Sequence, residues 1–371
     1  MTKTKPQLSI MTFFSELVDP RKKKGNIEHS LETIISITIC GLISGCDHYV
    51  AIHAFGIAHK AWLSTFLNLP NGIPSHDTFS RFFSRLDADQ FQVCFIKFIN
   101  SIREILPNEV IAIDGKTLRR SFLNKKKQDT IHIVSAYATS QELILGQVKV
   151  QEKSNEITAI PALLKLIVLK GAFVTIDAIG CQKEFAKEIV EKNADFCFNV
   201  KMNQPKLHSS CVEAFENAEK IPNYISIDKD HGRNEKRNAF LINKMPDHIK
   251  NNWPNVNAIV KIESTREEDN EPSNTDRYFI TSSKKNIKYI AEGIRSHWGI
   301  ENLVHRHLDV SFKEDGSRIR KGFGSENAST LRRLALVLFN MCPSIKGSLE
   351  IKRLAATWSD CNRLSILGGF V

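Results

Sequence analysis

The sequence predicts an α/β protein in which a mixed β-sheet carries helices on its faces. Three observations lead to this prediction: apolar segments with helical periodicity up to Leu106, buried strands that alternate with helices from Val110 to Lys201, and short strands between Tyr224 and Ser282. The order strand-strand-strand-helix-strand-helix-strand in the middle segment indicates a mixed sheet. Single cores usually stop growing at ~250–300 residues, so a chain of 371 residues is expected to contain more than one domain.

Residues 1–106 are predicted to form a smaller helical domain. The segment HSLETIISITICGLISG begins with Ser30 as a helix cap, and VAIHAFGIAHKAWLSTFL is expected to be a second helix. A helix from Thr78 to Leu86 follows a turn and carries Arg81 and Arg85 one helical turn apart. This arrangement is compatible with a helix-turn-helix that reads the major groove of DNA. The simpler alternative is an ordinary helical bundle.

Residues 107–345 are predicted to form the main α/β domain. The strands VIAID, TIHIVSAYA and ELILGQVKV come first. The strands AFVTID and DFCFNVK follow, with helices expected over 158–169 and 183–192.

A β-rich insertion is expected in this domain at about residues 220–284. Its strands are YISID, KRNAFLIN, VNAIVKIES and RYFITSS, and the acidic segment STREEDNEPSNTD is expected to be a hairpin tip. Helices are expected again from Ile287 and from Glu326, and residues 346–371 are expected to form a C-terminal tail.

Composition and charge indicate a soluble protein that binds a polyanion. Hydrophobic residues make up 42% of the chain and charged residues 25%, which is typical of globular proteins. The longest apolar run, near Ile34 to Ile43, is too short to span a bilayer, and the pattern of a signal peptide is not expected from the segment MTKTKPQLSI. The eight cysteines form no CxxC pair, which favours a reduced, cytosolic protein. The net charge is +10, and six cations without an acid lie between Gly115 and Gln128.

Three carboxylates are candidates for one catalytic site. Asp114 and Asp177 are each expected at the end of a buried strand, where α/β proteins expose functional side chains, although a turn or cap role is common there. Glu301 lies in the apolar stripe of a helix that starts at Ile287, where it needs a cationic partner. That partner is either a basic side chain or a metal ion. Converging carboxylates with a phosphodiester substrate would suit two Mg²⁺ ions.

Long blocks of the sequence resemble the DDE-type insertion-sequence transposases, in the branch of the H-repeat-associated proteins. The blocks are IAIDGKTLRRS, EKSNEITAIPALLKLIVLKGAFVTIDAIGCQKEFA, HGRNEKR and HWGIENLVHRHLDVSFKEDGSRIRKG. The resemblance implies an RNase H-like catalytic core with a β-strand insertion and a helical N-terminal domain. It also implies metal-dependent DNA strand cleavage and strand transfer, with Asp114, Asp177 and Glu301 as the catalytic, metal-binding acids.

The resemblance further implies partners and surroundings. The cofactor would be Mg²⁺ or Mn²⁺, and the substrates would be element ends and target DNA. The protein would be a bacterial, cytoplasmic one that associates with the nucleoid when bound to DNA, and it would act there as a homo-oligomer.

Nine residues are predicted to contact DNA. Most are cations that follow the acids in sequence or end the fifth strand, and two belong to an expected hairpin tip. They are Lys116, Arg119, Arg120, Lys201, His231, Arg233, Arg318, Arg320 and Lys321.

Two alternatives remain at this stage. The first is a catalytically silent DNA-binding remnant of a mobile element, since His297, Arg306 and Leu308 depart from residues usual in related proteins. The second is a two-carboxylate glycosidase, which would need no basic surface. The presence of all three acids favours the enzyme that acts on DNA.

Overall fold

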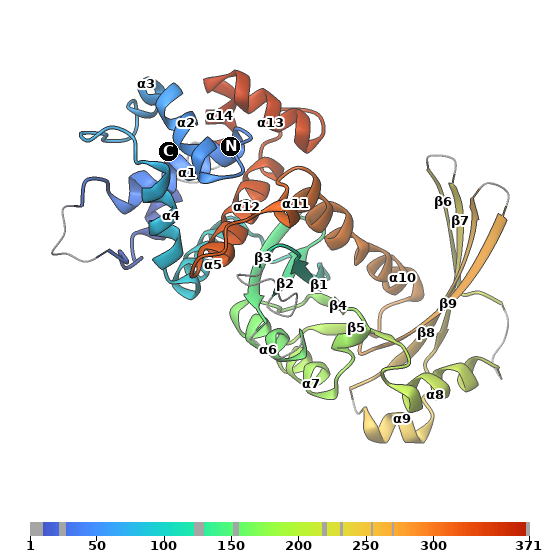
Figure 1. Cartoon of the computed structure of the whole chain (residues 1–371). Helices are drawn as coiled ribbons and strands as arrows, with labels where there is room; N and C mark the ends of the chain where they lie inside the picture. Colours follow the sequence, from blue (N-terminus) through green and yellow to red (C-terminus); the bar gives the residue numbers. More distant parts are fainter. Residues whose placement is uncertain are drawn as a thin grey trace, which may run out of the picture.

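One sheet runs through the molecule. The structure is a computed structural model that describes residues 10–21, 27–121, 130–150, 156–216, 221–230, 233–253, 255–268 and 271–368. Within these residues nine strands follow the order β3-β2-β1-β4-β5-β9-β8-β7-β6 (Figure 1). The strands are β1 (Val110–Leu118), β2 (Ile131–Ala138), β3 (Leu143–Lys149), β4 (Phe173–Ile176), β5 (Asp195–Val200), β6 (Tyr224–Asp230), β7 (Arg233–Ile242), β8 (Ala258–Glu268) and β9 (Glu271–Thr281). Strand β1 is antiparallel to β2 and parallel to β4, which confirms the prediction of a mixed sheet.

Helices flank the sheet and gather at one end of it. They are η1 (Ile10–Phe14), α1 (Leu31–Ile43), α2 (Tyr49–Ala58), α3 (Lys60–Leu63), α4 (His76–Arg85), α5 (Ala88–Ile102), α6 (Glu156–Leu166), η3 (Ala178–Gly180), α7 (Lys183–Glu191), α8 (Pro205–Glu216), α9 (Asp247–Asn252), α10 (Ile287–Ser296), η4 (Ile300–His305), α11 (Arg306–Val310), η5 (Glu314–Gly316), α12 (Gly324–Asn340), α13 (Leu349–Trp358) and α14 (Asp360–Leu367). Helices from both ends of the chain lie together, away from β6 to β9 (Figure 1). Their buried side chains share one apolar core with strands β1 to β5.

The N-terminal helices begin close to the predicted positions. The Ser30 hydroxyl accepts a hydrogen bond from the Thr33 N–H at 3.0 Å and so caps α1, as predicted. The expected second helix is broken at His59 into α2 and α3. Residues 64–75 separate α3 from α4, far more than the three or four residues of a helix-turn-helix connection. The structure therefore has the bundle, not the helix-turn-helix.

The strands predicted between residues 224 and 282 extend the main sheet through the antiparallel pair β5 and β9. The segment 264–276, expected to be a hairpin tip, is mostly strand, because β8 continues to Glu268 and β9 resumes at Glu271. The Lys261 ammonium of β8 contributes to this pairing, since it lies 2.9 Å from the Asp276 carboxylate of β9. The predicted hairpin is therefore present, but its paired strands extend further into the polar segment than expected.

The two faces of the sheet carry different helices. The hydroxyl of Thr175 on β4 lies 3.0 Å from Nδ1 of His297, which follows α10. The next side chain, Ile176, lies on the other face beside Ile160 of α6. Because side chains alternate along a strand, Asp177 returns to the face covered by α10 and η4. The alternation thus decides on which face Asp177 lies.

Two further features bear on the composition-based predictions. Among the described residues no helix combines the length and apolar character needed to cross a membrane. All eight cysteines are free thiols, and only Cys361 is exposed.

Candidate catalytic site and nucleic-acid interface

Two of the predicted catalytic acids lie on neighbouring parallel strands. Ile113 of β1 pairs in register with Ile176 of β4, so Asp114 and Asp177 follow at the same level. Adjacent strands are about 4.8 Å apart, and both side chains project from the face covered by α10 and η4. Asp177 directly follows its strand, as predicted. Strand β1 does not end at Asp114 but continues to Leu118, because these residues pair with β2.

Asp177 has a cationic partner. The Lys201 ammonium lies 3.2 Å from Oδ1 and 3.4 Å from Oδ2, and the Asn199 side-chain amide donates to Oδ1 at 3.2 Å. Burial opposes ionisation of Asp177, but the Ala178 N–H and the Lys201 ammonium hold its pKa below the ordinary value. Lys201, predicted to face the substrate, is therefore brought to the second aspartate.

Asp114 lies in a more enclosed position with no such cation. Its side chain is 21% exposed, and its Oδ2 is 3.5 Å from Nδ1 of His305. Burial, reinforced by the carboxylates of Glu301, Glu156 and Asp177, raises the pKa of Asp114 to about 7. Burial and the nearby Arg333 lower the pKa of His305 to about 3, so this ring is neutral and does not neutralise Asp114.

Glu301 faces a hollow instead of the apolar core. A π-helical turn, in which the Arg306 N–H bonds to the Glu301 carbonyl, changes the helical phase, so Ile300 and Val304 occupy the buried positions. The prediction that Glu301 lies within the apolar stripe is therefore wrong. Its exposed side chain lines a cavity of about 200 Å³ together with Asp177. Partial burial and Asp177 raise the pKa of Glu301.

A fourth acid, Glu156, was missed by sequence reasoning. A Cβ atom added to Gly115 would lie 2.3 Å from Oε1 of Glu156. This carboxylate from α6 therefore packs directly against the backbone of the residue that follows Asp114. Burial raises the pKa of Glu156, and Asp177 contributes to the increase. The available signal was an acid two residues before the helix expected over 158–169, which is ordinarily explained by an interaction with the helix N-terminus.

These carboxylates fit a divalent cation by chemistry. No group of three or more His, Cys, Asp or Glu residues within the described ranges is arranged closely enough to hold an ion as it stands. The pKa values of Asp114, Glu156 and Glu301 are nevertheless all raised by burial and by neighbouring carboxylates, so a bound cation would stabilise their ionised forms. Lys201 already acts as a cation on Asp177, and oxygen donors suit Mg²⁺ or Mn²⁺.

The cations after Asp114 have different surroundings. Lys116 is buried, and its ammonium lies 2.6 Å from Asp309 and 3.2 Å from Asp315. It presents no free face to a phosphate, contrary to the simplest form of the prediction. The Arg119 side chain is 80% exposed and lies 3.2 Å from Asp315, and Arg120 is also exposed. The remaining lysines of this basic run fall in residues 122–129, outside the described residues.

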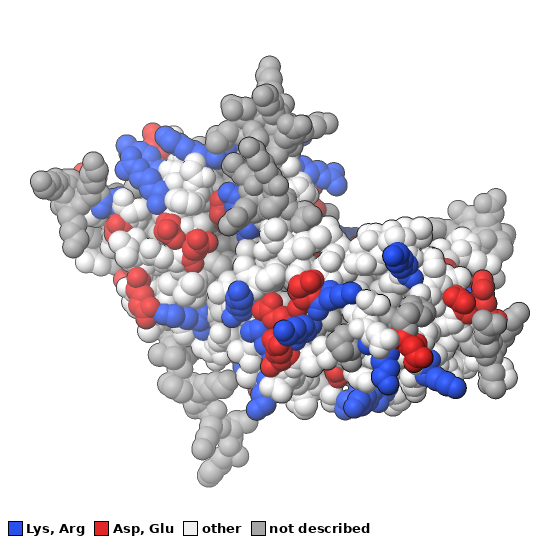
Figure 2. Space-filling model, turned by 90° about the horizontal axis from the view of Figure 1, so that it is seen from below, with Lys and Arg blue, Asp and Glu red and all other residues white. Residues whose placement is uncertain are grey.

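The other predicted DNA contacts are spread over the molecule. Arg318 and Lys321 are exposed on the turn before α12, and Arg320 there is half-buried. His231 lies outside the described residues, as does the side chain of Arg233 at the start of β7. On the face seen from below, basic and acidic side chains are interspersed, and no broad region carries one sign of charge (Figure 2). On this face the described cations are therefore mixed with acids and do not gather in one patch.

The comparisons with known proteins define the class of protein. Residues 106–338 match the family described as "Transposase DDE domain". Residues 11–99 match a companion family described as "DDE_Tnp_1-associated". The chain belongs to the DDE transposase family, which confirms the resemblance.

Individual relatives cover nearly the whole chain. "Putative transposase YncI" of Escherichia coli O157:H7 is 38% identical over 95% of this chain and 93% of its own length. "H repeat-associated putative transposase YhhI" of Escherichia coli K12 is 35% identical over 95% of this chain and 96% of its own length. A solved structure, the "piggyBac transposase synaptic complex with hairpin DNA", is similar at a TM-score of 0.48, with 12% identity over 97% of this chain and 80% of that one.

Proposed function

We propose that this protein is an active transposase that cleaves DNA strands at the ends of an insertion sequence and joins them to target DNA. The observation that carries the proposal is the pair Asp114 and Asp177 at one level of β1 and β4, with Glu301 beside the same face of the sheet. The antiparallel β1–β2–β3 meander, continued by the parallel strands β4 and β5, supports an RNase H-like core for this site.

Asp114, Asp177 and Glu301 would hold Mg²⁺ or Mn²⁺, and we propose two ions. Such ions, when bound, lower the pKa of water or of a 3′-hydroxyl and neutralise the charge on the scissile phosphate. The protein contributes the positions of its carboxylates. His305 would orient the Asp114 carboxylate through their present contact. The Lys201 ammonium would leave Asp177 and bind a phosphate oxygen of the substrate instead.

The DNA backbone would lie along exposed cations near these acids. The residues proposed to contact phosphates are Arg119, Arg120, Lys201, Arg318, Arg320, Lys321, Arg233 and His231. Lys116 is instead proposed to position the segment that carries Asp315, because its ammonium is buried against that carboxylate. Binding through phosphates predicts a steep loss of affinity as salt is added.

We also propose a domain organisation, an oligomeric state on DNA and a cellular location. Residues 1–106 would be a helical domain that helps to bind element ends, and residues 107–345 the catalytic domain with its insertion at about 220–284. Residues 346–371, expected to be a C-terminal tail, include α13 and α14, which pack against α1. Cleavage and joining of two ends would require a homo-oligomer on DNA, in the bacterial cytoplasm at the nucleoid.

The test is strand cleavage by the wild-type chain and by Asp177→Asn. Wild type is expected to nick duplexes carrying candidate repeat ends only with Mg²⁺ or Mn²⁺, scored strand by strand on denaturing gels. Asp177→Asn removes one negative charge and should lower cleavage at least a hundredfold without weakening DNA binding. Unchanged nicking by Asp177→Asn would remove this residue from the mechanism.

The same assay separates the enzyme from a silent DNA-binding remnant. A remnant would bind the repeat ends in a salt-dependent manner and leave both strands intact with either ion. That result would replace our proposal with the alternative.

A further inference from the structure

The turn at residues 317–323, between η5 and α12, is anchored to the catalytic strand β1. The buried Lys116 of β1 holds Asp315 at 3.2 Å, just before the turn, and Arg119 lies 3.2 Å from the same carboxylate. The Arg332 guanidinium of α12 donates to the Ser317 hydroxyl at 3.0 Å. The start of the turn is therefore fixed by ion pairs and hydrogen bonds to two separate elements.

The end of the turn is pressed against α4. Gly322 has φ +52°, and a Cβ atom there would lie 2.1 Å from the carbonyl oxygen of Ser84. The Phe323 N–H donates to that same carbonyl at 3.1 Å. The buried Asn327 side chain donates to the carbonyls of Phe83 and Leu86, each at 2.8 Å. The first turn of α12 and the last turn of α4 are thus locked together.

This contact brings cations from distant parts of the sequence close together, since Arg85 adjoins Ser84 and Lys321 adjoins Gly322. Arg81 and Arg85 are exposed on α4, and Ser84, the residue against which the turn packs, lies between them. Arg318 and Lys321 are exposed on the turn itself. The Arg320 Nε donates to the Arg120 carbonyl at 2.7 Å, which links the turn to the end of β1.

We propose that Arg81, Arg85, Arg318 and Lys321 form one surface, the α4–turn surface, that binds the phosphate backbone of duplex DNA on its way to the catalytic carboxylates. The surface deepens the proposed function, since the identity of the ligand as DNA rests on that function. Phosphates favour exposed guanidinium and ammonium groups held at fixed spacing.

The anchoring distinguishes this surface from an ordinary solvated basic segment. An exposed turn loses conformational entropy when it binds a ligand, and this cost falls if the turn is already rigid. The buried side chains of Lys116 and Asn327 hold the turn in place, whereas Arg318 and Lys321 on the turn are exposed to solvent. Such an arrangement is expected where the position of a charged turn matters for binding.

The test measures the salt dependence of binding to a 30-base-pair duplex of arbitrary sequence, with EDTA present. A plot of log K against log salt has a negative slope, and each lost phosphate contact reduces the magnitude of this slope by about one. Two double variants remove two cations each: Arg81→Gln/Arg85→Gln and Arg318→Gln/Lys321→Gln. Each should reduce the magnitude of the slope by about two. The charge-preserving variant Arg81→Lys/Arg85→Lys should keep the wild-type slope. The matched control is Lys165→Gln/Lys187→Gln, which removes two exposed lysines of α6 and α7 and should leave the slope unchanged.

Thermal unfolding in the same buffer checks that each variant folds. If one Gln pair does not fold, the other carries the test. A folded Arg81→Gln/Arg85→Gln variant with the wild-type slope would overturn the proposal of a shared surface, as would an equal loss in the α6–α7 control. The assay needs no catalysis, so absence of metal-dependent nicking would defeat the proposed function and leave this result standing.

Discussion

Asp114 and Asp177 are chemically identical residues at the same level of the sheet, but their surroundings shift their pKa values in opposite directions. Lys201 and the Ala178 N–H stabilise the ionised form of Asp177. Asp114 is more buried and faces three other carboxylates, and the neutral His305 does not compensate its charge. Without a divalent ion, and at pH values below about 7, Asp114 therefore holds a proton more readily than Asp177 does.

This difference predicts opposite effects of two substitutions on stability. The pKa of Asp114 rises on folding from 3.8 to about 7, so the native state holds an extra proton between these values, and stability falls as the pH rises through that window. Asp114→Asn should remove this decline and raise the melting temperature at pH 8 in EDTA. Asp177→Asn should lower the melting temperature, because Lys201 loses its partner. Melting curves at pH 5 and pH 8 measure both.

Addition of Mg²⁺ or Mn²⁺ provides a second readout of the same site. An ion that binds only the native state raises the melting temperature by mass action. Wild type should gain stability at pH 8, and Asp114→Asn should gain less. An equal gain in both would argue that the ion binds elsewhere.

At the scale of elements, two short segments determine how the site is presented. The π-helical turn η4 places Glu301 toward the hollow that it shares with Asp177. The glycine in the turn before α12 allows this segment to contact α4. Both are local departures from regular helix geometry, and π-helical turns occur frequently at functional sites.

Gly322→Ala is expected to destabilise the protein by about 2 kcal/mol or more, since a left-handed conformation disfavours a side chain. The added methyl group would also meet the Ser84 carbonyl at 2.1 Å, and a backbone atom cannot rotate away. The control is Gly316→Ala in the neighbouring η5, where a Cβ atom would have nothing within 4 Å. Its effect should stay within about 0.5 kcal/mol in urea denaturation. Similar losses in both variants would contradict the described contact.

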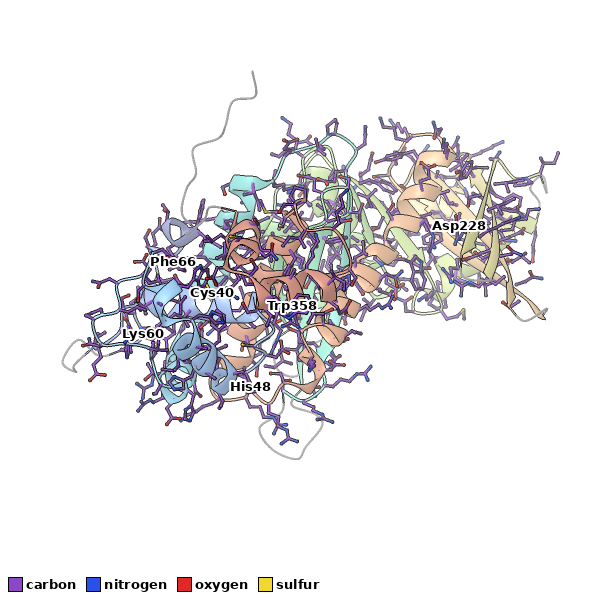
Figure 3. All side chains as sticks on the ribbon, turned by 90° about the horizontal axis from the view of Figure 1, so that it is seen from above. Cys40, His48, Lys60, Phe66, Asp228 and Trp358 are labelled. Atoms are coloured by element: carbon purple, nitrogen blue, oxygen red, sulfur yellow. The ribbon has the colours of Figure 1, made fainter. Side chains whose placement is uncertain are left out.

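At the scale of the whole molecule, the C-terminal helices return to the N-terminal ones. In Figure 3 the labelled Trp358 lies at the same end as Cys40 and His48, far from Asp228 on the extended strands. The Arg353 guanidinium of α13 donates to the Leu42 carbonyl at 3.2 Å and to the Asp47 carboxylate at 2.7 Å. The ends of the chain therefore stabilise each other through buried polar contacts as well as apolar packing.

Arg353→Met should lower the stability of the whole chain by about 2 kcal/mol or more, because it leaves a partly buried Asp47 without its cation. The loss should appear as a shift of one cooperative thermal transition, since the helices at both ends share a core with the sheet. Lys346→Met, at an exposed position before α13, serves as the control and should change little. A separate early transition for the helical end would contradict this expectation.

Sequence patterns were sufficient for the strands that lead to Asp114 and Asp177, the Ser30 helix cap, and the family. These features depend on alternation, capping and local composition, which are properties of neighbouring residues in the chain. The direction of Glu301 was not predictable, because a single π-helical turn changes the face that periodicity implies. The burial of Lys116, the approach of Glu156 to Gly115 and the contact of Gly322 with α4 were also not predictable. Each joins segments distant in sequence, and periodicity contains no information on which distant surfaces pack together.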